Sequence, residues 1–431
     1  MFRFSACKFT EDIRGGETVS EMIPVGSFQG MKSLNKSAIL NVVRQYAPIS
    51  RSKIAKLTKL TPPTVTNLVG ELIEAQLVVE STLGESTGGR KPILLRINSS
   101  AFYVIGVYAG AKRVKAVTAH LDGRVVKQVE MQYADNQTSE QFLLTLETAV
   151  EEVMQSTHPS REPFLGIGVG MHGLVDPERG LSLFAPHLNL RHISIKSALE
   201  KRFKLPVEVE NDVRAQALAE SWFGKGTGIL NFICVHVGTG VGAGIIIDNK
   251  LYRGTSFTAG EIGHTTIDSN GPRCSCGNYG CLETMVGGAA LTRRAQKAIR
   301  SGKDSIIEEW VAGDLDKIDG KMLYRAAQLG DQVAIEVLAD TGRYLGIGLT
   351  NLINTLNPAL IILSGGISRA EDFILKPLLK TLEKRALTKP ADAVTIAISE
   401  LGENSFAIGA FTLSLIKLFT PAGLGDVEFL I

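Results

Sequence analysis

The chain has 431 residues, of which 44% are hydrophobic and 21% charged, a composition typical of a soluble globular protein with two or three folding units. Its formal net charge is only +2, and no apolar run reaches the roughly 18 residues that a membrane span needs. Because the first thirty residues also lack the apolar segment of a signal peptide, we expect a cytoplasmic protein without a membrane partner.

The N-terminal part divides into an irregular stretch and a basic module. Residues 1–30 show no hydrophobic period, and we interpret them as a flexible tail or as an over-extended start before Met31. Between residues 31 and 100, ten Lys or Arg face four Glu, so ten minus four leaves a local charge of +6. This excess on a near-neutral chain predicts a polyanionic partner, and the alternative is a merely solvated basic face.

The basic module has the pattern of a winged helix-turn-helix. Ser50 and Thr61 are placed as helix caps, and Pro62 occupies a first helical position, where its missing N–H costs nothing. The expected helices cover residues 36–46, 51–60 and 61–73, and the expected wing strands cover 77–80 and 93–97. We therefore predict a DNA-binding domain over residues 31–98.

Side chains around the third helix are the candidate DNA contacts. Asn67 suits the N6 and N7 atoms of adenine, and Thr64 and Thr66 can reach bases or thymine methyl groups. Arg90, at the wing tip, would enter a neighbouring minor groove, while nearby lysines hold phosphates without reading sequence. The full candidate DNA-binding set is Arg51, Lys53, Thr61, Thr64, Thr66, Asn67, Arg90 and Lys91.

After residue 100 the pattern changes to strands that alternate with helices. Strands are predicted near residues 103–110, 115–121, 164–170, 207–210 and 359–363. Helices are predicted over 139–155 and 195–202, through most of 289–357, and over 405–419. This alternation indicates an α/β body.

Two segments beside predicted strands carry the polar groups of a candidate ligand site. Asn211 and Asp212 follow a strand, where α/β proteins gather ligands, and they can hydrogen-bond a sugar; the alternative is a plain helix cap. The glycine-rich segment 238–244 lies between apolar strands and can hold a phosphate or sugar oxygen on backbone N–H groups. Alone, this glycine pattern is a weak signal, because glycine turns between strands are common.

A later segment, residues 261–283, contains one imidazole and three thiols within eighteen positions. This set has the composition of a tetrahedral Cys₃His zinc site, and Gly277 and Gly280 allow the loop to turn back sharply. Three of the five cysteines lie within eight residues, which favours a metal over three free thiols. We predict a structural Zn²⁺ bound by His264, Cys274, Cys276 and Cys281.

The glycine spacing before the metal segment resembles a known family. The chain reads Gly-Val-Gly-Ala-Gly-Ile from Gly240, and Gly254, Gly260 and Gly263-His264 follow at the spacing of the ROK signature. ROK denotes repressors, open reading frames and sugar kinases. The cysteine cluster extends the match, and Gly173-Leu-Val-Asp-Pro, Glu210-Asn-Asp and Gly365-Gly fall in the family's order. The resemblance covers about residues 34–420. With its N-terminal module, the chain is similar to the repressor branch, which includes xylose-, N-acetylglucosamine- and glucose-responsive repressors.

The resemblance implies an actin-like (ribonuclease H-like), two-lobed sugar-binding body behind the DNA-binding domain. Lobe one would comprise residues 99–212 with 405–431, and lobe two, with the zinc loop, residues 213–404. The implied sugar ligands are Asn189, Asn211, Asp212, Glu261, His264 and Glu283. His264 would then contact both zinc and sugar, with one ring nitrogen for each.

The same resemblance implies a sugar-responsive transcriptional repressor of a carbohydrate-utilisation operon. It would bind a palindromic operator DNA as a homodimer, or as a tetramer, and be released by the sugar. A regulatory protein partner, with residues 424–431 as its contact, is a further possibility. The residues do not specify the sugar, and xylose, glucose and N-acetylglucosamine all stay open.

An ATP-dependent sugar kinase is the alternative, with Asp212 as the general base. The first kinase phosphate loop usually reads Asp-x-Gly-x-Thr, but this chain has Tyr108-Ala-Gly-Ala-Lys112. Where Gly-x-Pro-Gly is usual, Met171-His172-Gly173 stands instead. Because the carboxylate that manages Mg²⁺ is missing, we expect that the protein is not an enzyme.

Overall fold

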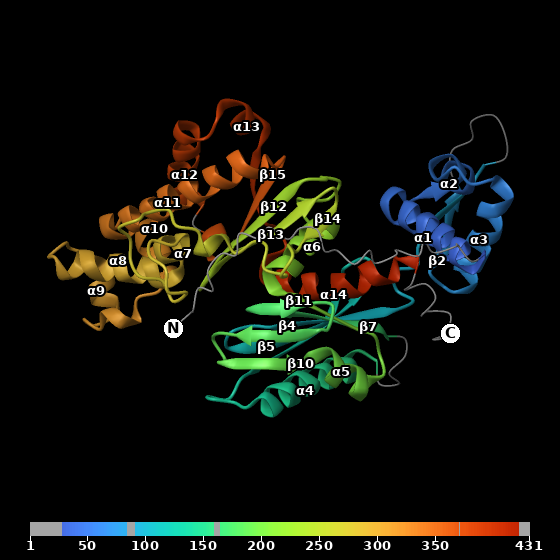
Figure 1. Cartoon of the computed structure of the whole chain (residues 1–431), viewed down its shortest axis with the longest axis horizontal. Helices are drawn as coiled ribbons and strands as arrows, with labels where there is room; N and C mark the ends of the chain where they lie inside the picture. Colours follow the sequence, from blue (N-terminus) through green and yellow to red (C-terminus); the bar gives the residue numbers. More distant parts are fainter. Residues whose placement is uncertain (1–27, 84–90, 159–163, 370, 422–431) are drawn as a thin grey trace, which may run out of the picture.

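The computed structural model of the chain describes residues 28–83, 91–158, 164–369 and 371–421. It places a small N-terminal module at one end of the long axis and a body of two α/β lobes beside it (Figure 1). Among the described residues, no helix is both long and apolar enough to cross a membrane.

The N-terminal module combines three helices with a small antiparallel sheet of order β1-β3-β2. Ser50 begins the second helix by accepting a hydrogen bond from the Lys53 N–H at 3.3 Å, and Thr61 begins the third. The elements are α1 (Phe28–Tyr46), β1 (Ile49–Ser50), α2 (Arg51–Thr58), α3 (Pro62–Glu74), β2 (Val78–Leu83) and β3 (Ile93–Ile97). The first helix starts at Phe28, eight residues before the predicted helix start at residue 36 and three before the predicted module boundary at residue 31. We propose that the module begins at Phe28.

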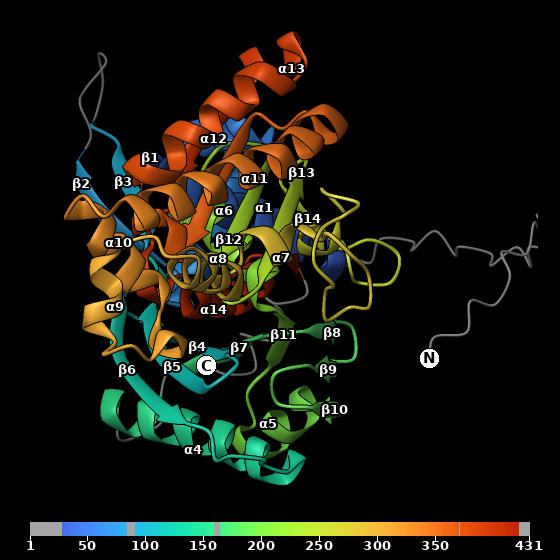
Figure 2. The ribbon, with the colours of Figure 1, turned by 90° about the vertical axis from the view of Figure 1, so that its left-hand side faces the viewer.

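Lobe one is built on a five-stranded sheet of order β11-β7-β4-β5-β6. Its strands are β4 (Tyr103–Ala109), β5 (Arg113–His120), β6 (Val125–Gln132), β7 (Phe164–Met171) and β11 (Val207–Asn211), with helices α4 (Ser139–Thr157) and α5 (Ile195–Phe203). A second, three-stranded sheet, absent from the predicted elements, comprises β8 (Leu174–Asp176), β9 (Leu181–Ala185) and β10 (Leu190–Ser194). Figure 2 shows α4 and α5 beneath the large sheet, with β8–β10 at its side.

Lobe two has a five-stranded sheet of order β14-β13-β12-β15-β16 and a large helical part. The strands are β12 (Phe232–Val237), β13 (Val241–Ile247), β14 (Lys250–Tyr252), β15 (Leu360–Gly365) and β16 (Thr395–Ile398). The helices are α7 (Leu282–Val286), α8 (Gly288–Arg300), α9 (Ile306–Trp310), α10 (Gly320–Gln328), α11 (Gln332–Leu356), α12 (Glu371–Arg385) and α13 (Thr388–Ala393). Short 3₁₀ turns are η1 (Ile262–His264), η2 (Leu315–Lys317), η3 (Gly366–Arg369) and η4 (Gly402–Asn404).

The two large sheets share one topology. Each starts with three antiparallel strands, β4–β6 in lobe one and β12–β14 in lobe two. A parallel strand then pairs with the first strand, β7 with β4 in one sheet and β15 with β12 in the other. A second parallel strand extends the sheet outward, β11 beside β7 and β16 beside β15. A duplicated sheet of this kind is what the predicted actin-like, two-lobed body requires.

Two helices join the lobes, α6 (Asp212–Phe223) and α14 (Ser405–Leu418), and they pack on each other (Figure 1). α14 lies on strands β4 and β7, whereas α6 lies on β12 and β13. α14 approaches the sheet so closely that a Cβ on Gly168 would lie 1.7 Å from the Ala410 carbonyl oxygen. The predicted lobe boundary after residue 212 therefore falls at the first residue of a helix that belongs to the junction.

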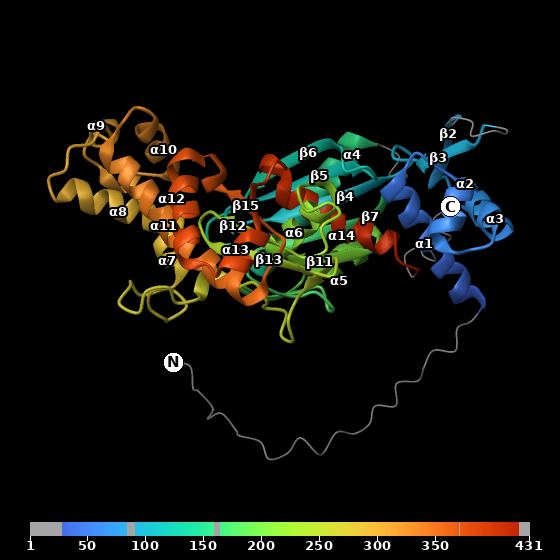
Figure 3. The same cartoon turned by 90° about the horizontal axis from the view of Figure 1, so that it is seen from above.

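The C-terminal ends of α6 and α14 contact α1 of the N-terminal module, and Figures 1 and 3 show α14 extending to the module. The side chains of Ser37 and Asn41, on α1, donate hydrogen bonds to the Phe419 carbonyl oxygen, the latter at 2.9 Å. The guanidinium of Arg44 lies 4.0 Å from the ring centroid of Trp222, near the end of α6. One apolar cluster runs from α1 to α14, so the module and the body share a core.

Candidate sugar, metal and DNA sites

The four candidate metal ligands lie together in the loop between β14 and α7. Their side-chain ligand atoms all lie within 4.8 Å of one another. The loop folds back through two isolated β-bridges, Thr266 with Cys281 and Arg273 with Tyr279. Gly280 has a φ of +62°, and a Cβ there would lie 1.5 Å from the Asp268 carbonyl oxygen, so this turn requires glycine.

The spacing of the four side chains fits a tetrahedral metal better than a disulfide. The Cys276 and Cys281 sulfurs are 3.7 Å apart, and the Cys274 sulfur is 3.6 Å from the Nδ1 of His264. With Zn–S near 2.3 Å and Zn–N near 2.05 Å, a tetrahedral ion separates two sulfurs by about 3.8 Å, and a sulfur from a nitrogen by about 3.6 Å. A disulfide would need about 2.05 Å. The cluster can therefore bind a metal.

His264 has its two ring nitrogens directed at different groups. Nδ1 faces the Cys274 sulfur, while Nε2 lies 4.0 Å from a carboxylate oxygen of Glu261. Glu261 is the residue before η1, so the same short turn holds both side chains. A metal on Nδ1 would leave the Nε2 hydrogen as a donor on the Glu261 side.

The acidic candidates come from three segments: Asp212 from the first turn of α6, Glu261 from the residue before η1, and Glu283 from α7. Asn211 caps α6 by accepting from the Arg214 N–H, and its amide donates to the Gly173 carbonyl oxygen at 3.1 Å. Asp212 is only 8% exposed, and burial raises its pKa to about 6, with the nearby charge of Glu261 adding to the rise. Glu283 accepts from the Val241 N–H at 3.0 Å. The site therefore combines three carboxylates with one side-chain amide.

An ion cluster around the buried Glu210 joins the lobes. Glu210, which is fully buried, accepts from the Nε atoms of Arg214 at 2.8 Å and Arg253 at 2.6 Å. Arg214 also donates to the Phe257 carbonyl oxygen, so it links α6 to the loop after β14. Sequence reasoning missed both arginines, although the i,i+4 spacing of Glu210 and Arg214 was a usable signal.

Asn189 stands apart from the other predicted sugar ligands. It is an exposed residue with a φ of +52° in the turn between β9 and β10. Its neighbour in that turn, His187, lies against His172, with ring centroids 5.7 Å apart. Asn189 therefore lies on a segment that the other predicted sugar ligands do not share, and its place among them stays a prediction.

The altered phosphate loop is covered by an aromatic stack. The Tyr108 ring folds over Gly110, where an added Cβ would lie 2.7 Å from the ring, and it stacks on Phe406 with centroids 4.6 Å apart. Phe406 in turn contacts the ring of His236, at 4.8 Å. Burial raises the pKa of Tyr108, and the negative charge of Asp212 adds to this rise.

The candidate DNA residues divide into free and occupied side chains. Lys53, Asn67 and Lys91 are exposed, and they lack side-chain partners within the described part of the chain. Arg51 instead forms an ion pair with Glu80 of β2 at 2.9 Å. The hydroxyls of Thr61 and Thr64 are 2.8 Å apart, and Thr66 donates to the Pro62 carbonyl oxygen at 2.9 Å. Arg90, like residues 424–431, lies outside the described residues.

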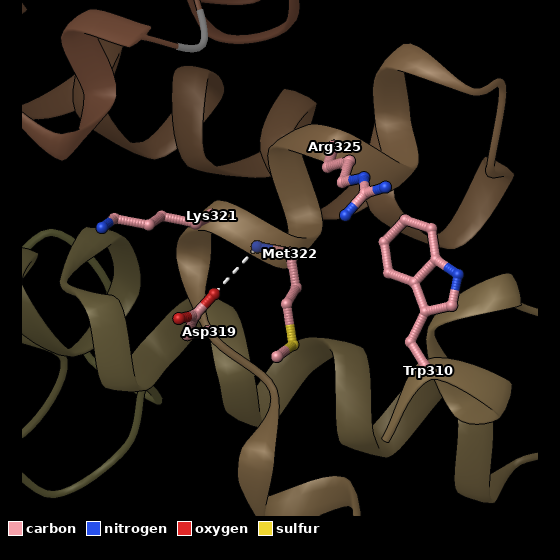
Figure 4. A pocket seen from close by; sticks show the side chains of 5 residues that line it. All are labelled: Trp310, Asp319, Lys321, Met322 and Arg325. Atoms are coloured by element: carbon pink, nitrogen blue, oxygen red, sulfur yellow. Dashed lines mark hydrogen bonds between the residues drawn. The ribbon is translucent and has the colours of Figure 1, made fainter. Parts of the chain in front are cut away.

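A separate pocket lies on the helical part of lobe two. Figure 4 shows its lining residues, Trp310, Asp319, Lys321, Met322 and Arg325. Asp319 accepts from the Met322 N–H at 2.8 Å and so caps α10, while Arg325 lies 5.2 Å from the Trp310 ring centroid. These polar groups are used within the fold, and the pocket contains none of the residues predicted for sugar, metal or DNA.

Comparison with known proteins identifies relatives that match nearly the whole chain. The xylose repressor of Caldicellulosiruptor bescii is 33% identical over 396 residues, which cover 92% of this chain and 99% of the relative. The DNA-binding transcriptional dual regulator NagC of Escherichia coli K12 is 34% identical over 391 residues, covering 90% of this chain and 94% of that protein.

Solved structures agree with these relatives. A ROK family transcriptional regulator, described as a homolog of the E. coli MLC protein, superposes with a TM-score of 0.83 at 28% identity, over 92% of this chain and 99% of that chain. A ROK family glucokinase from Streptomyces griseus, solved with glucose and AMPPNP, matches with a TM-score of 0.65 and 32% identity. It covers 98% of the kinase but 72% of this chain.

These comparisons confirm the predicted fold and the predicted resemblance to transcriptional repressors. The glucokinase shows that the sugar-kinase fold covers most of the chain, whereas the transcriptional regulator covers the N-terminal module as well. The sequence model of the ROK family matches residues 104–416, which is most of the sequence. The chain therefore belongs to the ROK family.

Proposed function

We propose that the protein is a sugar-responsive transcriptional repressor, which binds operator DNA through its N-terminal module and releases it when a sugar binds in the body. The observation that carries this proposal is helix α6. It begins at the candidate sugar ligands Asn211 and Asp212 and ends beside Trp222, whose ring contacts Arg44 of the DNA-binding module. One rigid element thus touches both sites.

The sugar would bind where α6 begins, near the metal loop. Carboxylates and amides with spare hydrogen-bonding capacity suit the hydroxyls of a pyranose, and partial burial strengthens such bonds. Of the predicted set, Asn211, Asp212, Glu261 and Glu283 support this placement best, because charge and hydrogen-bond relations connect them. We assign His264 and Asn189 to the edge of the same site, His264 from the metal loop and Asn189 from the β9–β10 turn.

Zinc would be held by His264, Cys274, Cys276 and Cys281. Four protein ligands close the coordination shell, so the ion supplies rigidity to the loop and no site for an activated water. Such a loop would hold Glu261 on one side and Glu283 on the other at fixed positions. The fit of the sulfur and nitrogen spacings to tetrahedral geometry supports this role.

For DNA, we propose that α3 enters the major groove with Asn67 towards base edges. Lys53 and Lys91 would neutralise phosphates, because both are exposed and carry no partner among the described side chains. We expect a smaller contribution from Arg51, since its ion pair with Glu80 offsets part of its charge. A twofold-symmetric operator would require a homodimer, or a tetramer made of two such dimers.

Sugar control requires that the sugar bind the released form more tightly than the DNA-bound form. About 100-fold differential affinity supplies roughly 2.7 kcal/mol of coupling. The test is a titration of a labelled operator complex with D-xylose, D-glucose and N-acetyl-D-glucosamine. One of them should raise the operator Kd about 100-fold. If all three leave the operator Kd unchanged at saturating concentration, sugar control in this form is wrong.

A sugar kinase is the second candidate, and the intact glycine segment 238–244 and Asp212 favour it. Against it, the Tyr108 ring covers the altered phosphate loop, and Glu283 already uses the Val241 N–H of the glycine segment. A coupled assay with ATP, Mg²⁺ and the same three sugars separates the two. Turnover at the ordinary kinase rate of roughly 1–100 s⁻¹ would replace the repressor assignment with an enzyme.

A further inference from the structure

His172 occupies the end of β7, between the strands that lead to the candidate sugar site. Met171 pairs with Ala109 of β4 on one side and with Asn211 of β11 on the other, so the next residue lies beside Asn211. The Asn211 amide donates to Gly173, the residue that follows His172. His172 is only 7% exposed and therefore belongs to the floor of this region.

The hydrogen bond to Ala109 fixes the tautomer of His172. Its Nδ1 lies 3.1 Å from the Ala109 carbonyl oxygen. A carbonyl oxygen can only accept, so Nδ1 must carry the hydrogen. Burial lowers the pKa of His172 to about 4, and the imidazole is therefore neutral near pH 7. In this form Nε2 has no hydrogen and is purely an acceptor.

The Nε2 acceptor of His172 is buried, and no described residue donates a hydrogen bond to it. A buried acceptor without a donor is unfavourable, and the free-energy cost disappears when a donor arrives. The neighbour across the ring is His187, an exposed side chain on the β9–β10 turn that a ligand can displace.

We propose that His172 is a further sugar contact, whose Nε2 accepts a hydrogen bond from one hydroxyl of the bound sugar. This inference rests on the proposed function and adds a selectivity element to it. A hydroxyl suits this position because it donates to Nε2 and keeps its oxygen free to accept elsewhere. A sugar that lacks this hydroxyl would leave the acceptor unpaired, so His172 would discriminate between sugars.

Two matched variants separate the two ring nitrogens. His172→Asn keeps a donor near the position of Nδ1 and has no acceptor near Nε2. His172→Gln has a longer side chain and carries a carbonyl oxygen near the position of Nε2. Thermal melting first verifies that both are folded. Calorimetry then gives the Kd of D-xylose, D-glucose and N-acetyl-D-glucosamine, and of the monodeoxy analogues of the tightest binder.

For the wild type, one monodeoxy analogue should bind about 3- to 10-fold more weakly than its parent sugar, as expected for a lost neutral hydrogen bond. His172→Asn should weaken the parent sugar by a similar factor and abolish the discrimination against that analogue. His172→Gln should retain it. If all three proteins discriminate equally, His172 is not the contact. If the wild type binds none of the three sugars, the proposed function itself fails, and this inference fails with it.

A measurement on the wild-type chain does not depend on how the variants fold. In ¹⁵N-histidine NMR, the Nε2 resonance of His172 should move towards the hydrogen-bonded position when the sugar is added, while Nδ1 stays protonated. An Nε2 resonance that does not move at saturating sugar would overturn the proposal.

Discussion

The contact between Arg44 and Trp222 is where we expect the sugar signal to reach the DNA-binding module. The guanidinium lies 4.0 Å from the Trp222 ring centroid, and Arg44 Nε is buried without a hydrogen-bond partner among the described residues. Cation–π contacts contribute about 0.5–1 kcal/mol at exposed sites and about 2 kcal/mol when desolvated. Because this pair is half-buried, Trp222→Leu should remove about 1–2 kcal/mol of the free energy that holds α1 of the module against α6.

A loss of about 1–2 kcal/mol corresponds to a 5- to 30-fold change in an equilibrium constant. If α6 transmits the signal, Trp222→Leu should reduce the sugar effect on operator Kd from about 100-fold to about 3- to 20-fold. Fluorescence anisotropy with a labelled operator measures this, with and without saturating sugar. Sugar affinity of the free protein should change little, because Trp222 lies at the far end of α6 from the sugar ligands.

The chain offers a matched control in lobe two. Trp310 of α9 forms a similar contact with Arg325 of α10, at 5.2 Å, at the opposite end of the molecule from the module (Figure 1). Trp310→Leu should therefore leave the sugar effect on operator binding unchanged. If Trp222→Leu keeps the full 100-fold effect, or if Trp310→Leu reduces it equally, the route through α6 is wrong.

Three other predictions follow from the site geometry. Cys276→Ser should lose zinc, measured by elemental analysis, and also the response to sugar; zinc-free protein with normal induction would contradict the link. Because Asp212 has a raised pKa of about 6, it is ionised above that pH and protonated below it, so sugar affinity should fall as the pH drops from 7 to 5. The Asp212→Asn variant should bind the sugar weakly at every pH from 7 to 5, as measured by calorimetry. In operator binding assays, Asn67→Ala should weaken the free energy of operator binding by about 1–3 kcal/mol and reduce the base preference at one operator position. Lys53→Ala should weaken binding to all DNA sequences alike and lower the slope of log K against log salt concentration by about 0.9.

Features that depend on local sequence were predictable. The caps at Ser50 and Thr61 mark the starts of α2 and α3, and the glycine and cysteine spacing predicted a loop that brings four potential ligands together. These signals work because a cap or a tight turn is decided by residues within a few positions of each other. The start of α1 at Phe28 was missed, because its first turn contains Gly30 and no acidic residue that would mark a helix start.

Features that depend on distant residues were not predictable in the same way. The sequence marks Tyr108 only as the residue that replaces the kinase carboxylate, because its stacking partner Phe406 is almost 300 positions away. The ion pair between Arg51 and Glu80 offsets part of the positive charge that Arg51 offers to DNA. This pair depends on how strand β2 of the wing lies beside α2, which the sequence alone does not show. The acceptor role of His172 depends on the Ala109 carbonyl oxygen, a group that every residue possesses.

Reciprocity between the sugar and the operator tests the central claim most directly. If the two sites are coupled, the operator must weaken sugar binding by the same factor by which the sugar weakens operator binding. Calorimetric titration of the sugar into the free protein and into the operator complex measures that factor. We predict a sugar Kd about 100-fold higher in the complex, whereas an identical sugar Kd in the two titrations would contradict the account.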